Sequence, residues 1–340
     1  MKNPLQRSFF KKLKVFHPKV KVQDIAKNLD LSVSGAYAKM NGSNAMTYDE
    51  AITLCLAFDV SIDAMMFQAP DNTAPYSFYS NSLKFTHQSY YEFINNASNH
   101  LKQIKHIPQL HITYISQELP ITLLLQFPHL MSYKLCMWDM LNWEINTTFT
   151  EENLIFHAIN EDIRMACNEF YHNYTLIPTT EMWHVNMLTS TYRQLHHSVN
   201  TGKIKNVIIL RRIIDDLKNL IFYMEDRVRK GKKYLIDNPT IFNKKIEILV
   251  NDISTQNEMV LAKGYDFSIV YNAFDTPNYL RSSDIRVITY MDQIVEKVRK
   301  NGVKVMEPIN AEYMKEFFNK LNYELETNTS QLLEKSLSQE

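Results

Sequence analysis

The chain has 340 residues, 45% of them hydrophobic, a formal net charge of zero and only six glycines. This length predicts two or three domains, and the apolar content excludes a disordered chain. So few glycines argue against the Rossmann and P-loop architectures, which need glycine at their phosphate-binding turns, and favour helices.

The charge is unevenly distributed along the chain. Up to Asn41 there are nine lysines and arginines against two aspartates, a net charge of +7, so the remainder carries −7. A basic head on an acidic body is typical of a nucleic-acid-binding module joined to a second part. A solvated basic face is the alternative. The basic residues are Lys2, Arg7, Lys11, Lys12, Lys14, Lys19, Lys21, Lys27 and Lys39.

Apolar residues at helical spacing predict five short helices in this basic head. Ser32 is a good N-cap for the third helix, and Thr47 with Glu50 forms a capping box for the fourth. Asp30-Leu31 is the expected turn between the second and third helices. The expected helices span residues 5–16, 22–29, 33–40, 48–58 and 61–66.

The second and third of these helices predict a helix-turn-helix unit. On the third helix, Val33, Ala36, Tyr37 and Met40 follow a spacing that predicts packing against its partners. The start of such a helix reaches base edges in the major groove, where Val33 can also contact a thymine methyl group. The expected DNA-binding residues are Gln23, Ser32, Val33, Ser34, Ala38, Lys39, Asn41, Ser43 and Asn44. The alternative is that the serines and Asn41 serve only as caps and turn residues.

The runs AYAKMNG, MTYDEA and VSID carry a resemblance to a known family. Residues 5–67 resemble the lambda-repressor-like, XRE-type DNA-binding domain. They are still more similar to large bacterial regulators whose recognition helix has the sequence AYR(R/K)I-x-G. In those regulators the segments LT-x-x-EA and IS-x-D follow. Ala26 stands where this family packs a small residue, and Asp30 fills a turn position that often holds glycine. The resemblance implies a five-helix fold that reads double-stranded DNA as a dimer.

Two residues gain a role from the resemblance. Lys39 occupies a position that is usually apolar in the family, so it is expected to face the phosphates. Asn44 matches a loop position that contacts DNA in the family. Gln23, at the start of the second helix, is expected to help hold a phosphate. The absence of arginine from this edge makes bidentate guanine reading unexpected.

A linker over residues 69–82 separates the first domain, residues 1–68, from the rest. Residues 83–232 predict a helical oligomerisation or sensing domain. Its expected helices include 180–199, which follows Pro178, and 204–230, while 107–117 is expected to be a turn or a short extended piece. Trp138 and Trp143 lie in its most hydrophobic region, which predicts a core hairpin; a small-molecule pocket lined by aromatic side chains is the alternative.

The period of the hydrophobic pattern changes after Gly231. Residues 233–326 predict a small α+β segment with an antiparallel meander over 245–253, 258–262 and 267–274, followed by helices. Residues 327–340 are expected to be a polar tail. The predicted fold class is therefore mainly α. It has a five-helix DNA-binding domain, a large helical domain and a small α+β C-terminal part.

Motifs for catalysis or metal binding are weak. His196-His197 is an unconvincing metal pair, because adjacent residues point about 100° apart on a helix. Cys55, Cys136 and Cys167 are expected to be buried thiols in a reducing cytosol. No signal peptide or membrane span is predicted. The expectation is a cytoplasmic protein that is not an enzyme and uses no cofactor or metal.

These patterns lead to one hypothesis of function and one main alternative. The hypothesis is a sequence-specific transcriptional regulator, expected to be a repressor, that binds double-stranded DNA as a homodimer. A small-molecule or peptide effector would act through the second part. The alternative is a peptide- or protein-binding regulator whose helical array carries the main interaction and whose DNA binding is secondary.

Overall fold

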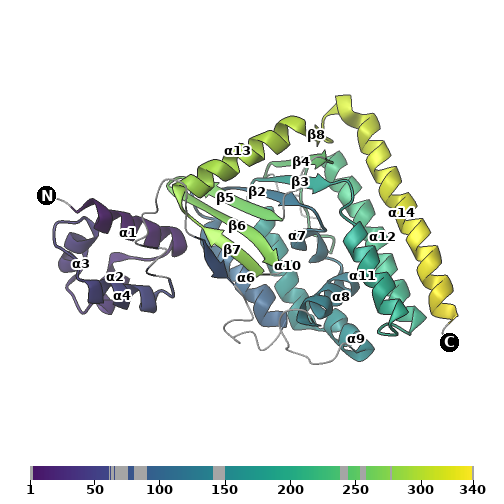
Figure 1. Ribbon diagram of the computed structural model, residues 1–340, viewed down its shortest axis with the longest axis horizontal. Coiled ribbons are helices and arrows are strands. Elements are labelled where there is room, and N and C mark those ends of the chain that lie inside the picture. Colours follow the sequence, from purple (N-terminus) through teal and green to yellow (C-terminus); the bar gives the residue numbers. More distant parts are fainter. Residues whose placement is uncertain are drawn as a thin grey trace.

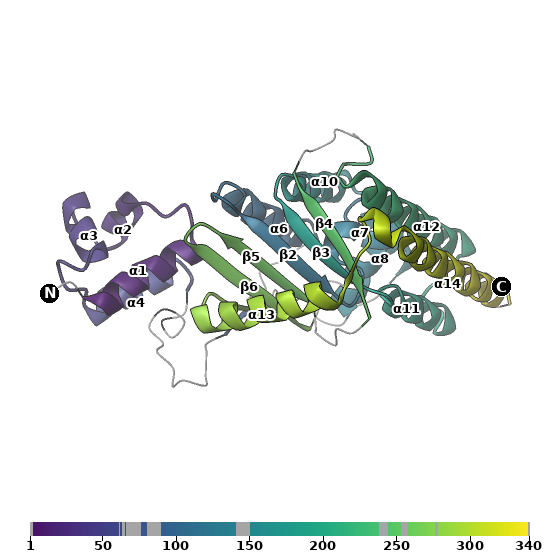
Figure 2. The same cartoon turned by 90° about the horizontal axis from the view of Figure 1, so that it is seen from above.

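A computed structural model describes residues 3–60, 62, 65, 76–79, 90–140, 150–237, 244–252, 258–275 and 278–338. Four helices form the N-terminal lobe: α1 (Pro4–Phe16), α2 (Val22–Asn28), α3 (Val33–Met40) and α4 (Tyr48–Ala57). They confirm four of the five expected helices; the fifth, over 61–66, falls largely outside the described residues. Figures 1 and 2 show this lobe at one end of the molecule, beside β5 and β6.

Local signals in the sequence explain where these helices begin. The Ser32 hydroxyl accepts a hydrogen bond from Gly35 N, and the Thr47 hydroxyl accepts one from Glu50 N. Phe9, Leu13, Ile25, Ala36 and Leu54 are fully buried between the helices. A short apolar stripe from each helix therefore makes the core of the lobe.

The rest of the chain is built on an eight-stranded mixed sheet with the order β1-β7-β6-β5-β2-β3-β4-β8. Three neighbouring strands, β2 (His111–Ser116), β3 (Thr179–His184) and β4 (Ile246–Asn251), run parallel. The antiparallel strands β5 (Met259–Gly264), β6 (Phe267–Asp275) and β7 (Asn278–Ser282) extend it beyond β2. The edges are β1 (Ser77–Tyr79) and β8 (Val303–Lys304).

Helices cover the two faces of the sheet unequally (Figure 1). Ile112, Trp183 and Ile248 point to the face that carries most of the helices, while Ile115, Met182 and Leu249 point to α13 (Ile285–Asn301) on the other. The helices on the first side are α6 (Tyr90–Ile104), α7 (Ile121–Leu124), α8 (Pro128–Trp138), α9 (Glu151–Ile159), α10 (Glu161–Thr175), α11 (Thr189–Asn200), α12 (Val207–Lys230) and α14 (Ala311–Leu337).

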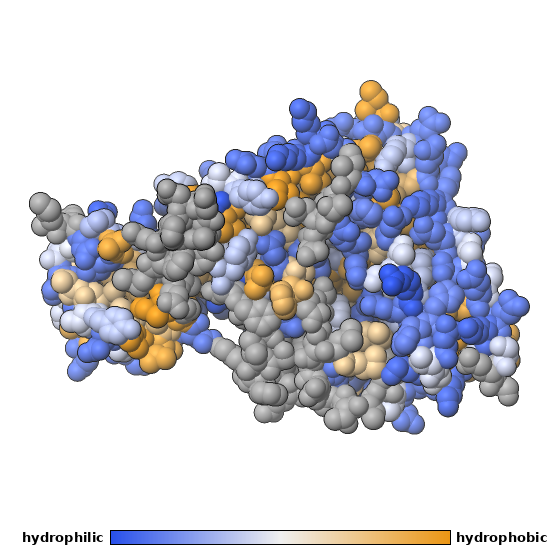
Figure 3. Space-filling model, in the orientation of Figure 1, coloured by the Kyte–Doolittle hydropathy of each residue, from blue (hydrophilic) through white to orange (hydrophobic). Residues whose placement is uncertain are grey.

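The surface follows this arrangement. In Figure 3 the face toward the viewer is mostly hydrophilic over α12 and α14, and hydrophobic side chains gather beside α13. Among the described helices, none combines the length and the apolar character needed to cross a bilayer. Cys55, Cys136 and Cys167 are buried free thiols, as expected.

The predicted fold class was wrong beyond the N-terminal lobe. The prediction of a large helical domain followed by a small α+β part fails because β2 and β3, inside the supposed helical region, pair with β5 and β4. The helix expected over 180–199 is instead β3 followed by α11. The helices cover a sheet and do not stack as a separate array.

A buried ion pair ties β3 to α12. The Arg227 guanidinium donates hydrogen bonds to both carboxylate oxygens of Glu181, at 2.5 and 3.3 Å, and both side chains are buried. The Tyr174 hydroxyl and the Trp183 indole N–H also donate to this carboxylate, at 2.8 and 3.0 Å. Four donors therefore satisfy a charge that burial would otherwise disfavour.

Candidate nucleic-acid interface

Helices α2 and α3 pack directly against each other through small residues. Ala26 on α2 and Ala36 on α3 are buried, so the two backbones can approach closely. In the turn between them, Asp30 has φ +51°, and Leu31 N donates to Ala26 O at 2.9 Å. Aspartate is one of the few residues besides glycine that tolerates this left-handed conformation. The turn therefore forms although its expected glycine position holds Asp30.

The outer side of α3 exposes both polar and apolar side chains. Val33 is 50% exposed and Tyr37 61%, and Ser34 beside them is exposed as well. Within the stripe that was predicted to pack inward, only Ala36 is fully buried. The prediction was therefore wrong for Tyr37, whereas the exposure of Val33 agrees with its second predicted place, facing the groove. Tyr37 was missed as a surface residue because its spacing also fits a core position. Its i+4 relation to the outward candidate Val33 was the available signal.

The loop after α3 is held in place by α1. The buried Gln6 amide donates to Lys39 O and to Asn44 O, each at 2.7 Å, and accepts from Met46 N at 2.9 Å. Asn44 therefore has a fixed backbone and an exposed side chain. Such pre-organisation suits a residue that contacts a ligand, since little conformational freedom is lost on binding.

Lys39 requires a correction, because its surroundings leave it no phosphate-binding role. Its side chain is 7% exposed, and its ammonium group donates to Ala45 O at 2.7 Å and to the Glu50 carboxylate at 2.8 Å. This ammonium holds the loop between α3 and α4 from within. A charged residue in a usually apolar position is thus explained by a buried ion pair.

The remaining expected contacts divide into surface residues and local caps. Gln23 is exposed in the first turn of α2, and Ala38 is half-buried on α3. The Ser32 hydroxyl lies 3.0 Å from that of Ser34 while capping α3. Asn41 accepts a hydrogen bond from Ser43 N at 2.9 Å, which makes it a turn residue. Exposed lysines and arginines also lie on α1, on α2 and on the connection between them: Arg7, Lys11, Lys14, Lys19, Lys21 and Lys27.

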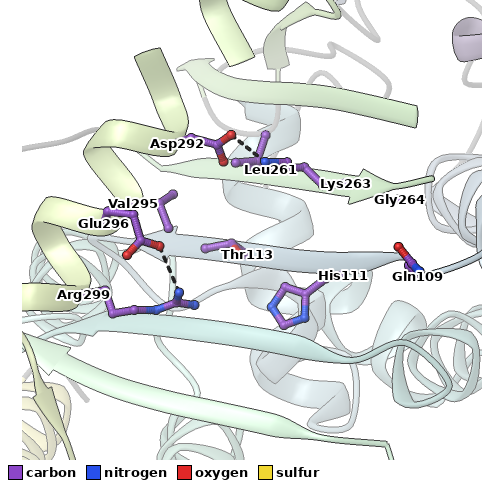
Figure 4. A pocket seen from close by; sticks show the side chains of 10 residues that line it. All are labelled: Gln109, His111, Thr113, Leu261, Lys263, Gly264, Asp292, Val295, Glu296 and Arg299. Atoms are coloured by element: carbon purple, nitrogen blue, oxygen red, sulfur yellow. Dashed lines mark hydrogen bonds and ion pairs between the residues drawn. The ribbon is translucent and has the colours of Figure 1, made fainter. Parts of the chain in front are cut away.

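A hollow lies between the sheet and α13, as Figure 4 shows. Its side chains bind one another. Lys263 forms an ion pair with Asp292, and Arg299 forms ion pairs with Glu296 at 2.9 Å and with Glu247 at 3.2 Å. Burial lowers the pKa of His111, which hydrogen-bonds to Thr180. Balanced pairs of this kind stabilise the packing of α13 and favour no particular ligand charge.

Comparison with protein-family models, with curated proteins and with solved structures gave no match.

Proposed function

We propose that this chain is a sequence-specific DNA-binding transcriptional regulator that inserts α3 into the major groove of double-stranded DNA. The observation that carries the proposal is the exposed side of α3. Val33, Ser34 and Tyr37 face outward from a helix that Ala26 and Ala36 hold against α2. A helix-turn-helix presents the start of its second helix in this way.

The surroundings of α3 support the same proposal. The exposed lysines and arginines of the N-terminal lobe supply the phosphate contacts that dominate affinity for DNA. Hydroxyl, amide and apolar groups then read the bases, with Ser34 and Asn44 as hydrogen-bonding residues and Val33 and Tyr37 as contacts for thymine methyl groups. In this proposal the lobe is a lambda-repressor-like reader, and the sheet-containing part is a non-catalytic regulatory domain.

The proposal extends to the assembly and the setting. One short helix makes few base contacts, so the protein is proposed to act in the cytoplasm as a homodimeric repressor on two half-sites. These half-sites would lie about one helical turn, ~34 Å, apart. An enriched sequence with two-fold symmetry is the signature of such a dimer.

Selection from fragmented genomic DNA tests the proposal. The full chain, with and without cell extract, is expected to retain fragments that share one sequence with two-fold symmetry. Affinity should fall steeply between 50 and 200 mM salt, by about three orders of magnitude for six phosphate contacts. Recovery of DNA without any shared sequence in both conditions would overturn direct reading by α3.

A further inference from the structure

A cavity of about 240 Å³ lies on the helix-covered face of the sheet, between α6, α7 and α10 and the strands β2, β5, β6 and β7. Its walls are mainly apolar and aromatic, with Phe93, Leu101, Ile112 and Phe170 among them. Apolar cavities of ~150 Å³ already hold benzene, and ligand pockets typically begin at ~300 Å³. The volume therefore suits a molecule of one ring with short substituents.

Two hydroxyl groups at this cavity have no hydrogen-bond partner among the residues that the structure places. They belong to Tyr114 on β2 and Thr122 on α7, which are 4% and 5% exposed. Buried hydroxyls are nearly always hydrogen-bonded, because burial removes their hydrogen bonds to water and an unpaired hydroxyl gains none in exchange. The pair therefore indicates a ligand with a polar group at this end.

Strand register places a cation at the other end of the cavity. Tyr114 lies opposite Val260, which lies opposite Tyr271, which lies opposite Arg281. Residues paired in this way share a face of the sheet, so the row crosses four strands, or ~14 Å. His100 hydrogen-bonds to the Tyr271 hydroxyl at 2.7 Å, and burial lowers its pKa to about 4, so it is neutral. Among the described lining residues, Arg281 supplies the positive charge.

We propose that this cavity binds an aromatic monocarboxylate with a polar substituent opposite the carboxylate. The ring would fill the apolar middle, the substituent would hydrogen-bond to Tyr114 and Thr122, and the carboxylate would approach Arg281. Tyrosine and arginine side chains are long, so in this proposal they lean toward each other along the row and shorten the span that the ligand must bridge.

Arg281 also connects the cavity to the N-terminal lobe. Its guanidinium lies over the ring of Phe16, 5.1 Å from the centroid, and Phe16 is the last residue of α1. Helix α1 packs against β6 as well. A carboxylate at Arg281 competes with the contact to Phe16 and so loosens α1 from the sheet. This effect on DNA binding rests on the proposed function. A dimer whose N-terminal lobes are loosely attached would bind two half-sites at a fixed spacing less tightly.

Binding itself is tested without DNA, by calorimetry and thermal unfolding of the full chain with para-hydroxybenzoate. Benzoate lacks the hydroxyl group that would pair with Tyr114 and Thr122, and para-hydroxybenzyl alcohol lacks the negative charge that Arg281 attracts. Each is therefore expected to bind at least ~10-fold more weakly than para-hydroxybenzoate. Lack of binding by para-hydroxybenzoate and by its homologue para-hydroxyphenylacetate would overturn the proposal.

Variants locate the site. Tyr114→Phe and Thr122→Val should weaken binding of para-hydroxybenzoate about 10-fold without lowering the melting temperature of the free protein, since each removes an unpaired hydroxyl. Tyr192→Phe is the matched control, because the Tyr192 hydroxyl is also buried without a described partner but lies outside the cavity. Equal affinity in Tyr114→Phe, Thr122→Val and Tyr192→Phe would place the ligand elsewhere.

Fluorescence anisotropy with the selected duplex tests the coupling. Saturating para-hydroxybenzoate is expected to lower DNA affinity within the range of allosteric couplings, about 5- to 150-fold. If the ligand binds and DNA affinity is unchanged, the contact between Arg281 and Phe16 transmits nothing, although the cavity and the DNA reader both stand. If the ligand binds and no duplex does, the proposed function fails and the cavity proposal survives.

Discussion

Tyr37 is the residue on which the proposed DNA-reading surface most depends. Its ring is exposed on α3, one turn after Val33, and a large apolar side chain in that place gains most when it is covered. Tyr37→Ala should weaken binding to the selected duplex about 10-fold through loss of contact with thymine methyl groups and sugars. The measurement is anisotropy at fixed salt.

Tyr323→Ala is the matched control for this change. Tyr323 is also an exposed tyrosine on a helix, but α14 lies at the opposite end of the molecule from the N-terminal lobe (Figure 1). The two variants should therefore differ in DNA affinity and agree in melting temperature. Unchanged DNA affinity in Tyr37→Ala would remove this residue from the interface.

Individual residues also show where inference from sequence ends. Ser32, Thr47 and Glu50 were predicted as caps and act as caps, because capping depends on neighbours within three residues. Lys39 could not be assigned correctly, since its partners Ala45 and Glu50 are brought to it by the loop after α3. Whether Tyr37 is buried or exposed depends on where α1 and α2 lie against α3, and the spacing of apolar residues within α3 does not give that position.

At the scale of elements, the pair Glu181–Arg227 joins the parallel strand β3 to α12. Removing one partner leaves a buried charge, so Glu181→Gln should lower the free energy of unfolding by about 3–5 kcal/mol in urea titrations at neutral pH. Glu225→Gln on the same helix breaks only an exposed i,i+4 pair with Arg229 and should cost less than ~0.5 kcal/mol. Equal effects would contradict the importance of burial.

The same pair predicts how stability depends on pH. Burial alone would raise the pKa of Glu181, but the Arg227 guanidinium and the donated hydrogen bonds outweigh it and lower the pKa below the usual 4.5. The contribution of this carboxylate is therefore present above pH 4.5 and is lost as the pH falls through the folded-state pKa. Below pH 4.5 the free energy of unfolding should fall more steeply in the wild-type protein than in Glu181→Gln, and parallel curves would refute this.

The strands differ in how far the sequence predicts them. Residues 245–253, 258–262 and 267–274 were expected to be strands and overlap β4, β5 and β6. β3 was mistaken for a helix because both of its faces are covered, one by α13 and the other by the remaining helices of the sheet. Its sequence TTEMWH therefore lacks the alternation of a half-exposed strand. Pro178, just before it, also fits the start of a helix.

At the scale of the whole molecule, the sheet was unpredictable because its pairings are distant in sequence. β2 lies between β3 and β5, so one sheet joins regions that the hydrophobic pattern divided into a helical and an α+β domain. The cavity has the same origin. Tyr114, Thr122 and Arg281 come from β2, α7 and β7, and only the register of the strands brings them to one cavity.

The N-terminal lobe, in contrast, was predictable because its elements are local. Each of its helices is short, capped and separated from the next by a few residues, and its basic charge is visible in the first 41 residues. How the lobe is attached was not predictable. The contact of Phe16 with Arg281 joins residues 265 positions apart. Through that contact, a ligand bound at the sheet would influence the proposed DNA binding of the N-terminal lobe.

The most direct test of DNA reading by α3 is the ratio of affinities for the selected duplex and a random duplex, compared between the wild-type protein and Ser34→Ala/Asn44→Ala. Both side chains are exposed and neutral, so the variant keeps every phosphate-binding cation. We predict that the ratio falls at least ~10-fold, with unchanged affinity for random DNA. An unchanged ratio, or an equal loss on both duplexes, would contradict base reading by this surface.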